Sequence, residues 1–388
     1  MKHKPILAID IGTTKVACAL GQPFQGHVGY PLASSSDLGF ELIGCGAARY
    51  PTLSSTWPPD RSVVARAVEQ ALEETHATSI PDQALVSLTH PELSHSRVPA
   101  QIDLSDEPIT IRSRDLQRLS AQALSQGLAI DRHALLLEAF GYSGNGFQDV
   151  KDPCGLMATR LTGTFHLIAI PIAARHFVMQ SLESVGVEVD HLIYSLRAAA
   201  AACLDERALS KRVLLLDIGG CCTDAAILDR GTLVNSLTVP WGGMCVAEAV
   251  AKECRVTMEQ ALTMSLGGLG SANSSVRRIV EQQLRVLQRG IHQLVKDGPI
   301  PDLAVVTGRG ALMEGLVEWV ERITEINATL GRSRNTKHLG DLHRQLALSP
   351  ALGLLTLACQ AVPPEPSRPS RLVDRLIDQT RHLLIEYF

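Results

Sequence analysis

Two segments half a chain apart repeat one pattern, and this internal repeat constrains the fold more than any other feature. Residues 6–20 form an apolar run, the turn Asp10-Ile11-Gly12-Thr13-Thr14-Lys15 and a second apolar run. Residues 213–228 repeat that order around Asp217-Ile218-Gly219-Gly220-Cys221-Cys222. Each copy predicts two buried strands joined by a tight glycine turn. We therefore expect a duplicated α/β fold with a ligand cleft between its halves.

The composition of the chain supports this fold and argues against several functions. Of the 388 residues, 45% are hydrophobic and only 4% aromatic, a balance that favours helices packed on buried sheets. The net charge of −4 provides no general attraction for nucleic acid. The nine cysteines show no metal-ligand spacing, which predicts reduced thiols in the cytoplasm. No apolar run is long enough to predict a signal peptide or a membrane-spanning helix.

The pattern of elements divides the chain into two halves, an insertion and a C-terminal extension. The insertion has short strand patterns around an amphipathic helix, and four prolines separate the second half from a final amphipathic segment. The expected segments are residues 1–83 with 168–200 (first half), 84–167 (inserted subdomain), 201–362 (second half), 363–370 (linker) and 371–388 (C-terminal helix).

The repeated turns also suit a nucleotide phosphate. Glycines allow backbone N–H groups to face phosphate oxygens, Thr13 and Thr14 add hydroxyls, and Asp10 and Asp217 can hold a hydrated magnesium ion. A third glycine turn, Gly308-Arg309-Gly310, follows the predicted strand 303–307 and is expected to face the same cleft.

These motifs resemble those of the actin-like ATPase superfamily and, within it, the FtsA family of bacterial cell-division proteins. The two repeated turns are similar to the phosphate motifs of the superfamily, and residues 307–311 are similar to its adenosine motif. The run Lys151-Asp152-Pro153-Cys154-Gly155-Leu156, followed by Arg160-Leu161 and Phe165-His166-Leu167-Ile168, resembles the special subdomain of FtsA. Residues 239–243 resemble its Pro-x-Gly-Gly segment, which adds Gly242 and Gly243.

The resemblance implies an actin-like (ribonuclease H-like) fold that binds ATP and magnesium. The implied nucleotide-binding residues are Asp10, Gly12, Thr13, Thr14, Lys15, Gly219, Gly220, Gly242, Gly243, Gly308, Arg309 and Gly310. Asp10 and Asp217 are the implied metal ligands, and Asp217 is also the candidate catalytic residue.

The same resemblance implies a cytoskeletal adaptor rather than a metabolic enzyme. Such a protein polymerises, binds the tubulin-like protein FtsZ, contacts other division proteins through its inserted subdomain, and lies on the inner face of the membrane at the division site. The apolar stripe of the C-terminal helix would bind that membrane, or alternatively another protein surface. The stripe consists of Leu372, Val373, Leu376, Ile377, Leu383, Leu384, Tyr387 and Phe388.

Several departures from the family pattern predict weak nucleotide binding and slow or absent hydrolysis. Cys221-Cys222 replaces a glycine and a hydroxyl residue of the second turn, and Arg309 replaces a glycine of the adenosine turn. Leu262 and Ser265 stand at the positions that commonly hold the ribose. Two alternative functions remain open: a pilus-assembly adaptor similar to PilM, and a small-molecule kinase of the same superfamily. No Ser/His/Asp or Cys/His constellation stands out.

Overall fold

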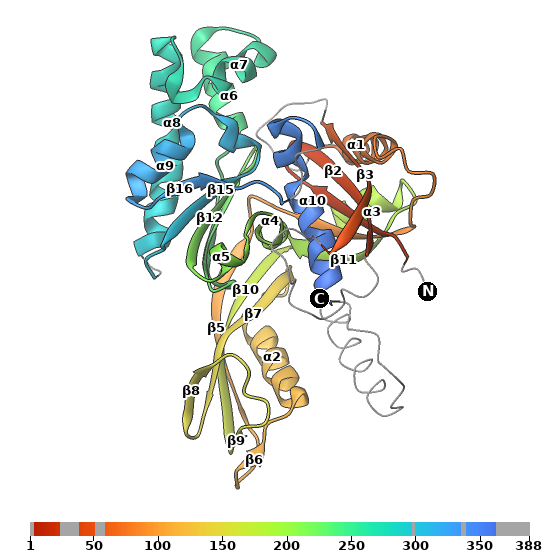
Figure 1. The fold of residues 1–388 in the computed structure, drawn as a ribbon, viewed down its shortest axis with the longest axis vertical. Coiled ribbons are helices and arrows are strands. Elements are labelled where there is room, and N and C mark those ends of the chain that lie inside the picture. The colour runs from red at the N-terminus through yellow and green to blue at the C-terminus, as the bar shows by residue number, and fades with distance from the viewer. Residues whose placement is uncertain (1–3, 24–38, 51–58, 297–298, 335–338, 362–388) are drawn as a thin grey trace.

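A computed structural model describes residues 4–23, 39–50, 59–296, 299–334 and 339–361. Two halves lie side by side, and an elongated subdomain extends from the junction between them (Figure 1). The predicted linker 363–370 and C-terminal helix 371–388 lie outside the described residues. Among the described residues, no helix combines the length and the apolar composition needed to cross a bilayer.

The two halves are built on five-stranded sheets with the same strand order. The first sheet consists, in spatial order, of β3 (Phe40–Arg49), β2 (Lys15–Pro23), β1 (Ile6–Ile11), β4 (Gln83–Leu88) and β11 (Glu188–Tyr194). The second consists of β14 (Thr232–Val239), β13 (Thr223–Asp229), β12 (Arg212–Ile218), β15 (Leu303–Thr307) and β16 (Ala328–Leu330). In each sheet the central strand is antiparallel to its hairpin partner and parallel to the strand on its other side. The predicted duplicated α/β fold is confirmed.

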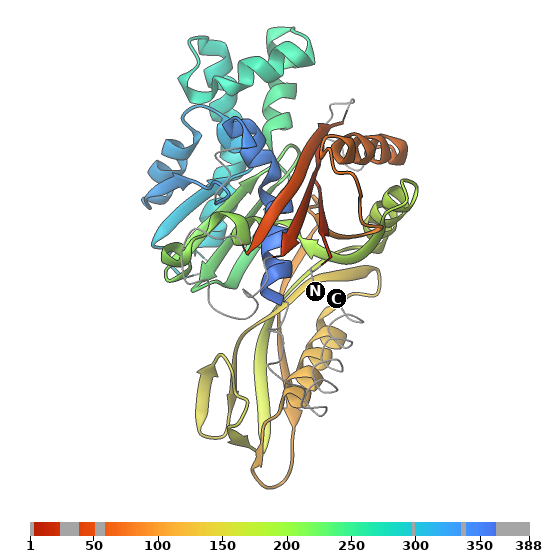
Figure 2. The ribbon, with the colours of Figure 1, turned by 45° about the vertical axis from the view of Figure 1, so that its right-hand side comes forward.

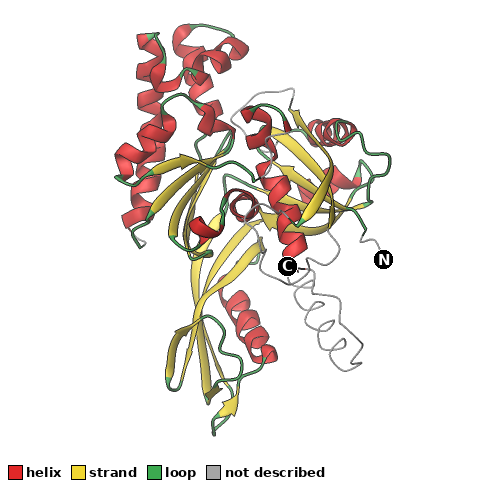
Figure 3. Ribbon diagram, in the orientation of Figure 1, coloured by secondary structure: helices red, strands yellow, loops and turns green. Residues whose placement is uncertain are grey.

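The inserted subdomain is a four-stranded sheet with one covering helix, as Figure 3 shows. Its elements are β5 (Ser94–Asp103), β6 (Ile109–Thr110), α2 (Ser113–Gly127), β7 (Arg132–Gly144), β8 (Phe147–Val150), β9 (Met157–Ala158) and β10 (Arg160–Pro171). The sheet has the order β5-β10-β7-β8, while β6 and β9 pair separately. Alternate residues of β5 and β10, such as Val98 and Phe165, pack with Leu119 of α2 into one apolar cluster.

Two boundaries expected from the sequence are wrong. The sequence pattern assigns the segment from Ala84 to Leu88 to the insertion, but β4 lies inside the first sheet, where it pairs with β1 and β11. The helix α10 (Leu342–Ala361) was placed in the second half, but it packs against β1, β2 and α4 (Ser195–Cys203) of the first half. Figure 2 shows α10 running alongside the first sheet. The strand β4 is short, and the helix α10 is apolar on all sides. Their sequence patterns therefore do not indicate which half each segment belongs to.

The contact between α10 and α4 explains the alanine-rich sequence of α4. A Cβ atom added to Gly353 of α10 would lie 1.8 Å from the carbonyl oxygen of Ala198, so the two helices touch backbone to backbone. Larger side chains at either position would separate them. The remaining helices of the first half are α1 (Arg61–Glu73) and α3 (Ile172–Glu183).

Helices also cover the second sheet and form the outer part of the second half. They are α5 (Glu206–Leu209), α6 (Gly243–Cys254), α7 (Met258–Leu266), α8 (Ser274–Lys296) and α9 (Leu316–Thr324), with short 3-10 turns at Gly268–Gly270 and Arg309–Leu312. The amphipathic α8 buries Ile279, Leu284, Leu287 and Ile291 at helical spacing in the second-half core.

Candidate functional site

The two repeated turns have the same backbone geometry. In the first, the N–H of Gly12 donates to the carbonyl of Lys15 at 2.9 Å. In the second, the N–H of Gly219 donates to the carbonyl of Cys222 at 3.0 Å. Each bond closes a tight turn between two buried strands, so the sequence repeat is also a structural one.

The two turns face each other and touch. The backbone N–H of Cys221 donates to the Thr13 hydroxyl oxygen at 2.9 Å. The Thr14 side chain packs on Gly220 so closely that an added Cβ there would lie 2.2 Å from its methyl group. The first turn therefore fills the space directly above the second, and only glycine fits at position 220.

Two further glycine segments complete the second half of the cleft. Gly243 and Met244, at the start of α6, donate their N–H groups to the carbonyls of Gly219 and Gly220 at 3.1 and 2.8 Å. A Cβ added to Gly242 would lie 2.4 Å from the carbonyl oxygen of Gly220. Gly308 has φ of 79°, and an added Cβ would lie 2.3 Å from the Asp217 carboxylate. The backbone therefore requires glycine at both positions.

Two cavities open beside these turns. The first, of about 120 Å³, has an apolar wall from α6, α7 and Met313, and its lining residues are Thr14, Arg49, Gly219, Gly220, Gly243, Met244, Leu262, Ser265, Leu266, Arg309, Gly310 and Met313. The second, of about 420 Å³, is lined by Lys15, Ala47, Ala48, Arg49, Glu74, Arg309, Asp341, His343, Arg344 and Ala347. Arg49 from the first half and Arg309 from the second line both cavities.

The first cavity suits a flat apolar group better than a sugar. Leu262 and Ser265 both line it, as expected for the positions that commonly hold the ribose. The Ser265 hydroxyl donates to the carbonyl of Ala261 at 2.6 Å, so its proton is already used within α7. None of the residues that line this cavity carries a carboxylate to accept from a ribose hydroxyl.

The carboxylate of Asp10 is buried and fully engaged. One oxygen accepts from the Lys15 ammonium at 2.9 Å, and the other accepts from the hydroxyls of Ser87 at 2.8 Å and Ser195 at 3.1 Å. These three donors stabilise the ionised carboxylate and fix its position at the floor of the cleft, by which we mean the buried carboxylates of the central hairpins.

Two further carboxylates lie on adjacent strands below the second turn. Asp217 of β12 and Asp224 of β13 are direct cross-strand partners. Burial, aided by the charges of Asp224 and Asp10 and opposed by Lys15, raises the pKa of Asp217 to about 7. Burial raises the pKa of Asp224 to about 6, against hydrogen bonds from Thr238 and Thr89 that favour the charged form.

The residues proposed for magnesium fit such an ion only in part. Magnesium keeps several waters and needs one or two free carboxylates. The side-chain carboxylate of Asp217 has no hydrogen-bond or ion-pair partner among the described residues and can provide one. Asp10 could contribute only by giving up its bond to Lys15. No group of three or more His, Cys, Asp or Glu side chains suited to a metal ion occurs among the described residues.

Most of the predicted site residues therefore lie around one cleft. Thr14, Gly219, Gly220, Gly243, Arg309 and Gly310 line the first cavity, and Lys15 lines the second. Gly12, Thr13, Gly242 and Gly308 shape the backbone instead, and Asp10 and Asp217 lie on the central strands β1 and β12. The eight predicted membrane residues between Leu372 and Phe388 lie outside the described residues.

Sequence reasoning missed other residues of the cleft. Ser87 and Ser195 donate to the Asp10 carboxylate, and Asp224 lies beside Asp217. Arg49 lines both cavities. Asp224 had a usable signal, because it follows the second turn by two residues at the start of a buried strand. The two serines carry no local motif and reach Asp10 only through the fold.

Comparison with protein families identifies two regions of the chain. Residues 214–353 match the family model described as "Cell division protein FtsA". Residues 90–169 match the model described as "SHS2 domain inserted in FTSA". The second match falls on the inserted subdomain, and the first covers most of the second half together with part of α10.

Similar proteins extend over nearly the whole chain. The cell division protein FtsA of Pseudomonas aeruginosa is 23% identical over 387 residues, which cover 92% of this chain and 90% of that protein. FtsA of Escherichia coli K12 is 21% identical over 391 residues, covering 91% and 90%. FtsA of Neisseria meningitidis is 23% identical over 394 residues, covering 92% and 91%.

Solved structures share the fold at low sequence identity. A chain of the PilM-PilN type IV pilus biogenesis complex has a TM-score of 0.64 at 13% identity, and the match covers 93% of this chain and 99% of that chain. MreB 5 of Spiroplasma citri bound to AMPPNP has a TM-score of 0.51 at 11% identity, covering 98% and 100%. These similarities establish an actin-like fold.

Proposed function

The chain belongs to the FtsA family of cell-division proteins, and from this premise we propose that it is a cytoskeletal adaptor. In this proposal the chain self-associates into filaments, binds FtsZ, and tethers the FtsZ ring to the inner face of the cytoplasmic membrane. Other division proteins would bind the inserted subdomain. The observation that carries the proposal is the match of residues 90–169 to the insertion of this family.

We further propose that the cleft binds ATP weakly and hydrolyses it slowly or not at all. The base would occupy the cavity against Met244, Leu262 and Met313, with Arg309 at its edge. The phosphates would lie between the two turns, where they must displace the contact between Thr13 and Cys221. That displacement costs a hydrogen bond already present in the free protein, which lowers the net gain from nucleotide binding.

The residues of the floor have distinct roles in this proposal. The N–H groups of Thr14 and Gly220 have no partner among the described residues and can donate to phosphate oxygens. Lys15 can supply a positive charge from the first half, and Asp217 would hold the magnesium ion and orient a water molecule near the last phosphate. When bound, magnesium would neutralise phosphate charge.

Co-sedimentation with FtsZ polymers tests the adaptor function. We expect the full chain in the pellet when FtsZ is polymerised with GTP, and in the supernatant when GTP is omitted. A chain that stays in the supernatant with polymers present would contradict the proposal. The two alternatives make other predictions: a small-molecule kinase would transfer phosphate from ATP to a sugar, and a pilus adaptor would bind a short peptide of a membrane partner without binding FtsZ.

A further inference from the structure

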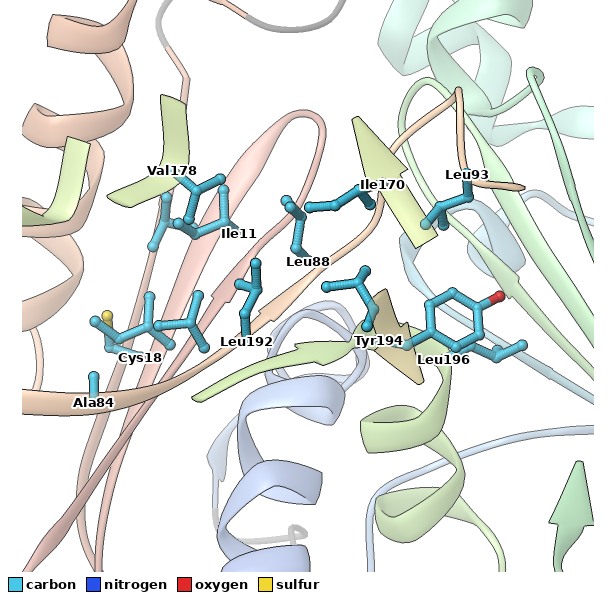
Figure 4. Close-up of a cluster of buried hydrophobic side chains, with 14 of the residues drawn as sticks. Ile11, Cys18, Ala84, Leu88, Leu93, Ile170, Val178, Leu192, Tyr194 and Leu196 are labelled. Atoms are coloured by element: carbon cyan, nitrogen blue, oxygen red, sulfur yellow. The ribbon is translucent and has the colours of Figure 1, made fainter. Parts of the chain in front are cut away.

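The inserted subdomain is joined to the first half by an apolar core. Leu93 before β5 and Ile168 and Ile170 at the end of β10 belong to the same buried cluster as Leu88 of β4. Figure 4 shows Ile170 next to Leu88, with Leu93 and Tyr194 on the other side of Ile170 in the same cluster. Separating these surfaces would expose apolar side chains to water, which holds the subdomain on the first half. The same cluster continues into the second half through Leu215, Leu228 and Leu233.

The second half is held by the subdomain in a different way. Hydrogen bonds from three subdomain strands reach β14, the edge strand of the second sheet, along most of its length. Arg97 of β5 donates to the carbonyl of Val234 at 2.9 Å, and the N–H of Leu233 donates to Glu138 of β7 at 3.3 Å. The Lys151 ammonium, after β8, donates to the Thr232 hydroxyl at 3.1 Å.

A buried chain of hydrogen bonds forms the centre of this interface. His166 Nε2 and His95 Nδ1 both contact the Ser236 hydroxyl, at 2.7 and 2.6 Å. His95 Nε2 contacts the Thr238 hydroxyl at 3.0 Å, and Thr238 donates to the Asp224 carboxylate at 2.5 Å. Asp224 lies beside Asp217, so the chain runs from the subdomain to the floor of the cleft.

The direction of every bond follows from the carboxylate at its end. Ionised Asp224 can only accept, so the hydroxyl proton of Thr238 points to it and Thr238 accepts from His95 Nε2–H. His95 Nδ1 is then an acceptor that receives the proton of Ser236, which in turn accepts from His166 Nε2–H. One proton arrangement accounts for every bond of this chain with both imidazoles neutral.

Burial is consistent with this neutral arrangement. It lowers the pKa of His95 to about 3 and that of His166 to about 4, so neither ring is charged near neutral pH. His166 is 2% exposed, and its Nδ1 has no hydrogen-bond partner among the described residues. An added proton at Nδ1 would have no acceptor there.

We propose that these contacts form a clasp that keeps the two halves closed without nucleotide. The clasp consists of Lys151, Glu138, Arg97, His95 and His166 on the subdomain, and Thr232–Thr238 on β14. The proposal does not depend on binding to FtsZ or to a membrane.

The clasp can open when the halves part, because water can replace its hydrogen bonds. The apolar contacts that the second half makes with the shared core, through residues such as Leu228 and Leu233, must open with it. Separation of the halves would break the clasp and also the contact between Thr13 and Cys221, since both bridge the same two bodies. We therefore expect the two contacts to open together.

Hydrogen exchange of the nucleotide-free protein, followed by mass spectrometry, tests this coupling. Ser236→Ala removes the hydroxyl shared by both histidines and changes little volume. We expect the turn Gly219–Cys222 to exchange at least roughly fivefold faster in this variant, because the amide of Cys221 loses its partner when the halves part. Ser181→Ala is the matched control: it removes an equally buried hydroxyl, bonded only within α3, and should leave the turn unchanged.

A second variant separates opening from loss of folding. Lys151→Met removes a contact at the exposed rim of the clasp and should speed exchange of the same turn by about twofold or more. If Ser236→Ala speeds exchange throughout the core, including α8, that variant has lost stability as a whole. The result with Lys151→Met then decides the outcome. An unchanged rate at Gly219–Cys222 in Lys151→Met, or in a Ser236→Ala variant that stays folded, would overturn the proposal. Wild-type protein whose turn is protected only when ATP is added would also overturn it.

Discussion

The hydroxyl oxygen of Thr13 accepts a hydrogen bond from the backbone N–H of Cys221 at 2.9 Å, across the cleft between the two halves. The bond joins the two copies of a duplicated turn, each closed by its own glycine N–H. In the ATP complex proposed above, the phosphates would lie between these two turns. The free protein instead joins the turns directly.

Restoring the family residues of the second turn should strengthen nucleotide binding. Cys221→Gly combined with Cys222→Thr returns backbone freedom and a hydroxyl to the turn, and we expect ATP to bind about tenfold more tightly in magnesium. Calorimetric titration measures the change. Cys254→Ala, at the end of α6, is a cysteine control away from the turn and should bind as wild type does. Equal affinity in the double variant and wild type would show that the two cysteines do not weaken the site.

Adjacent glycines should respond very differently to alanine. Gly242→Ala places a Cβ 2.4 Å from the carbonyl of Gly220 and should lower the free energy of unfolding by roughly 1–3 kcal/mol. Gly243→Ala meets its nearest atom only at 3.9 Å, so its effect should stay within about 0.5 kcal/mol. Urea unfolding of both variants checks the pair. Similar stability would mean that the second turn does not require the close backbone approach.

The raised pKa of Asp217 predicts a pH-dependent stability. Its folded pKa of about 7 lies above the ordinary value of 3.8, so the protonated carboxyl stabilises the folded state at low pH. This contribution is lost as the pH rises through about 7. Relative to Asp217→Asn, the wild type should lose up to about 1.4 kcal/mol per pH unit as the pH rises towards about 7, and the difference should level off above it.

Urea unfolding of both proteins from about pH 5 to about pH 8 measures this difference. Comparing the two proteins removes most of the contribution of the buried histidines, because it is common to both. A difference that stays constant across the pH range would mean that Asp217 is ionised in the folded state throughout.

We expect the predicted C-terminal helix, residues 371–388, to bind lipid through its apolar stripe. Leu376→Asp with Leu383→Asp places two charges in that stripe and should release the full chain from liposomes, since binding there rests on buried apolar area at roughly 25 cal/mol per Å². Gln379→Asp adds one such charge on the polar face and is the control. Lipid co-sedimentation measures both. If the double variant still pellets with liposomes, the helix is not the anchor.

Local patterns predicted the hairpins, the glycine turns and the long helix α8, because each depends on residues close in sequence. The place of α10 was not predictable, because its apolar residues suit either sheet and the close contact of Gly353 with Ala198 arises only in the fold. The same limit applies to the clasp, where His95 lies 141 residues from Ser236 in the chain. The histidine of the Phe165-His166-Leu167-Ile168 motif was recognised by resemblance, but its bond to Ser236 explains its position.

The adaptor function is tested most directly by reconstituting the tether from its three components. Liposomes, polymerised FtsZ and the full chain are mixed and separated by flotation. The account predicts that FtsZ floats with the liposomes when the full chain is present, and stays at the bottom of the gradient when the chain is omitted or carries Leu376→Asp with Leu383→Asp. FtsZ that remains at the bottom with the wild-type chain bound to the liposomes would contradict the account.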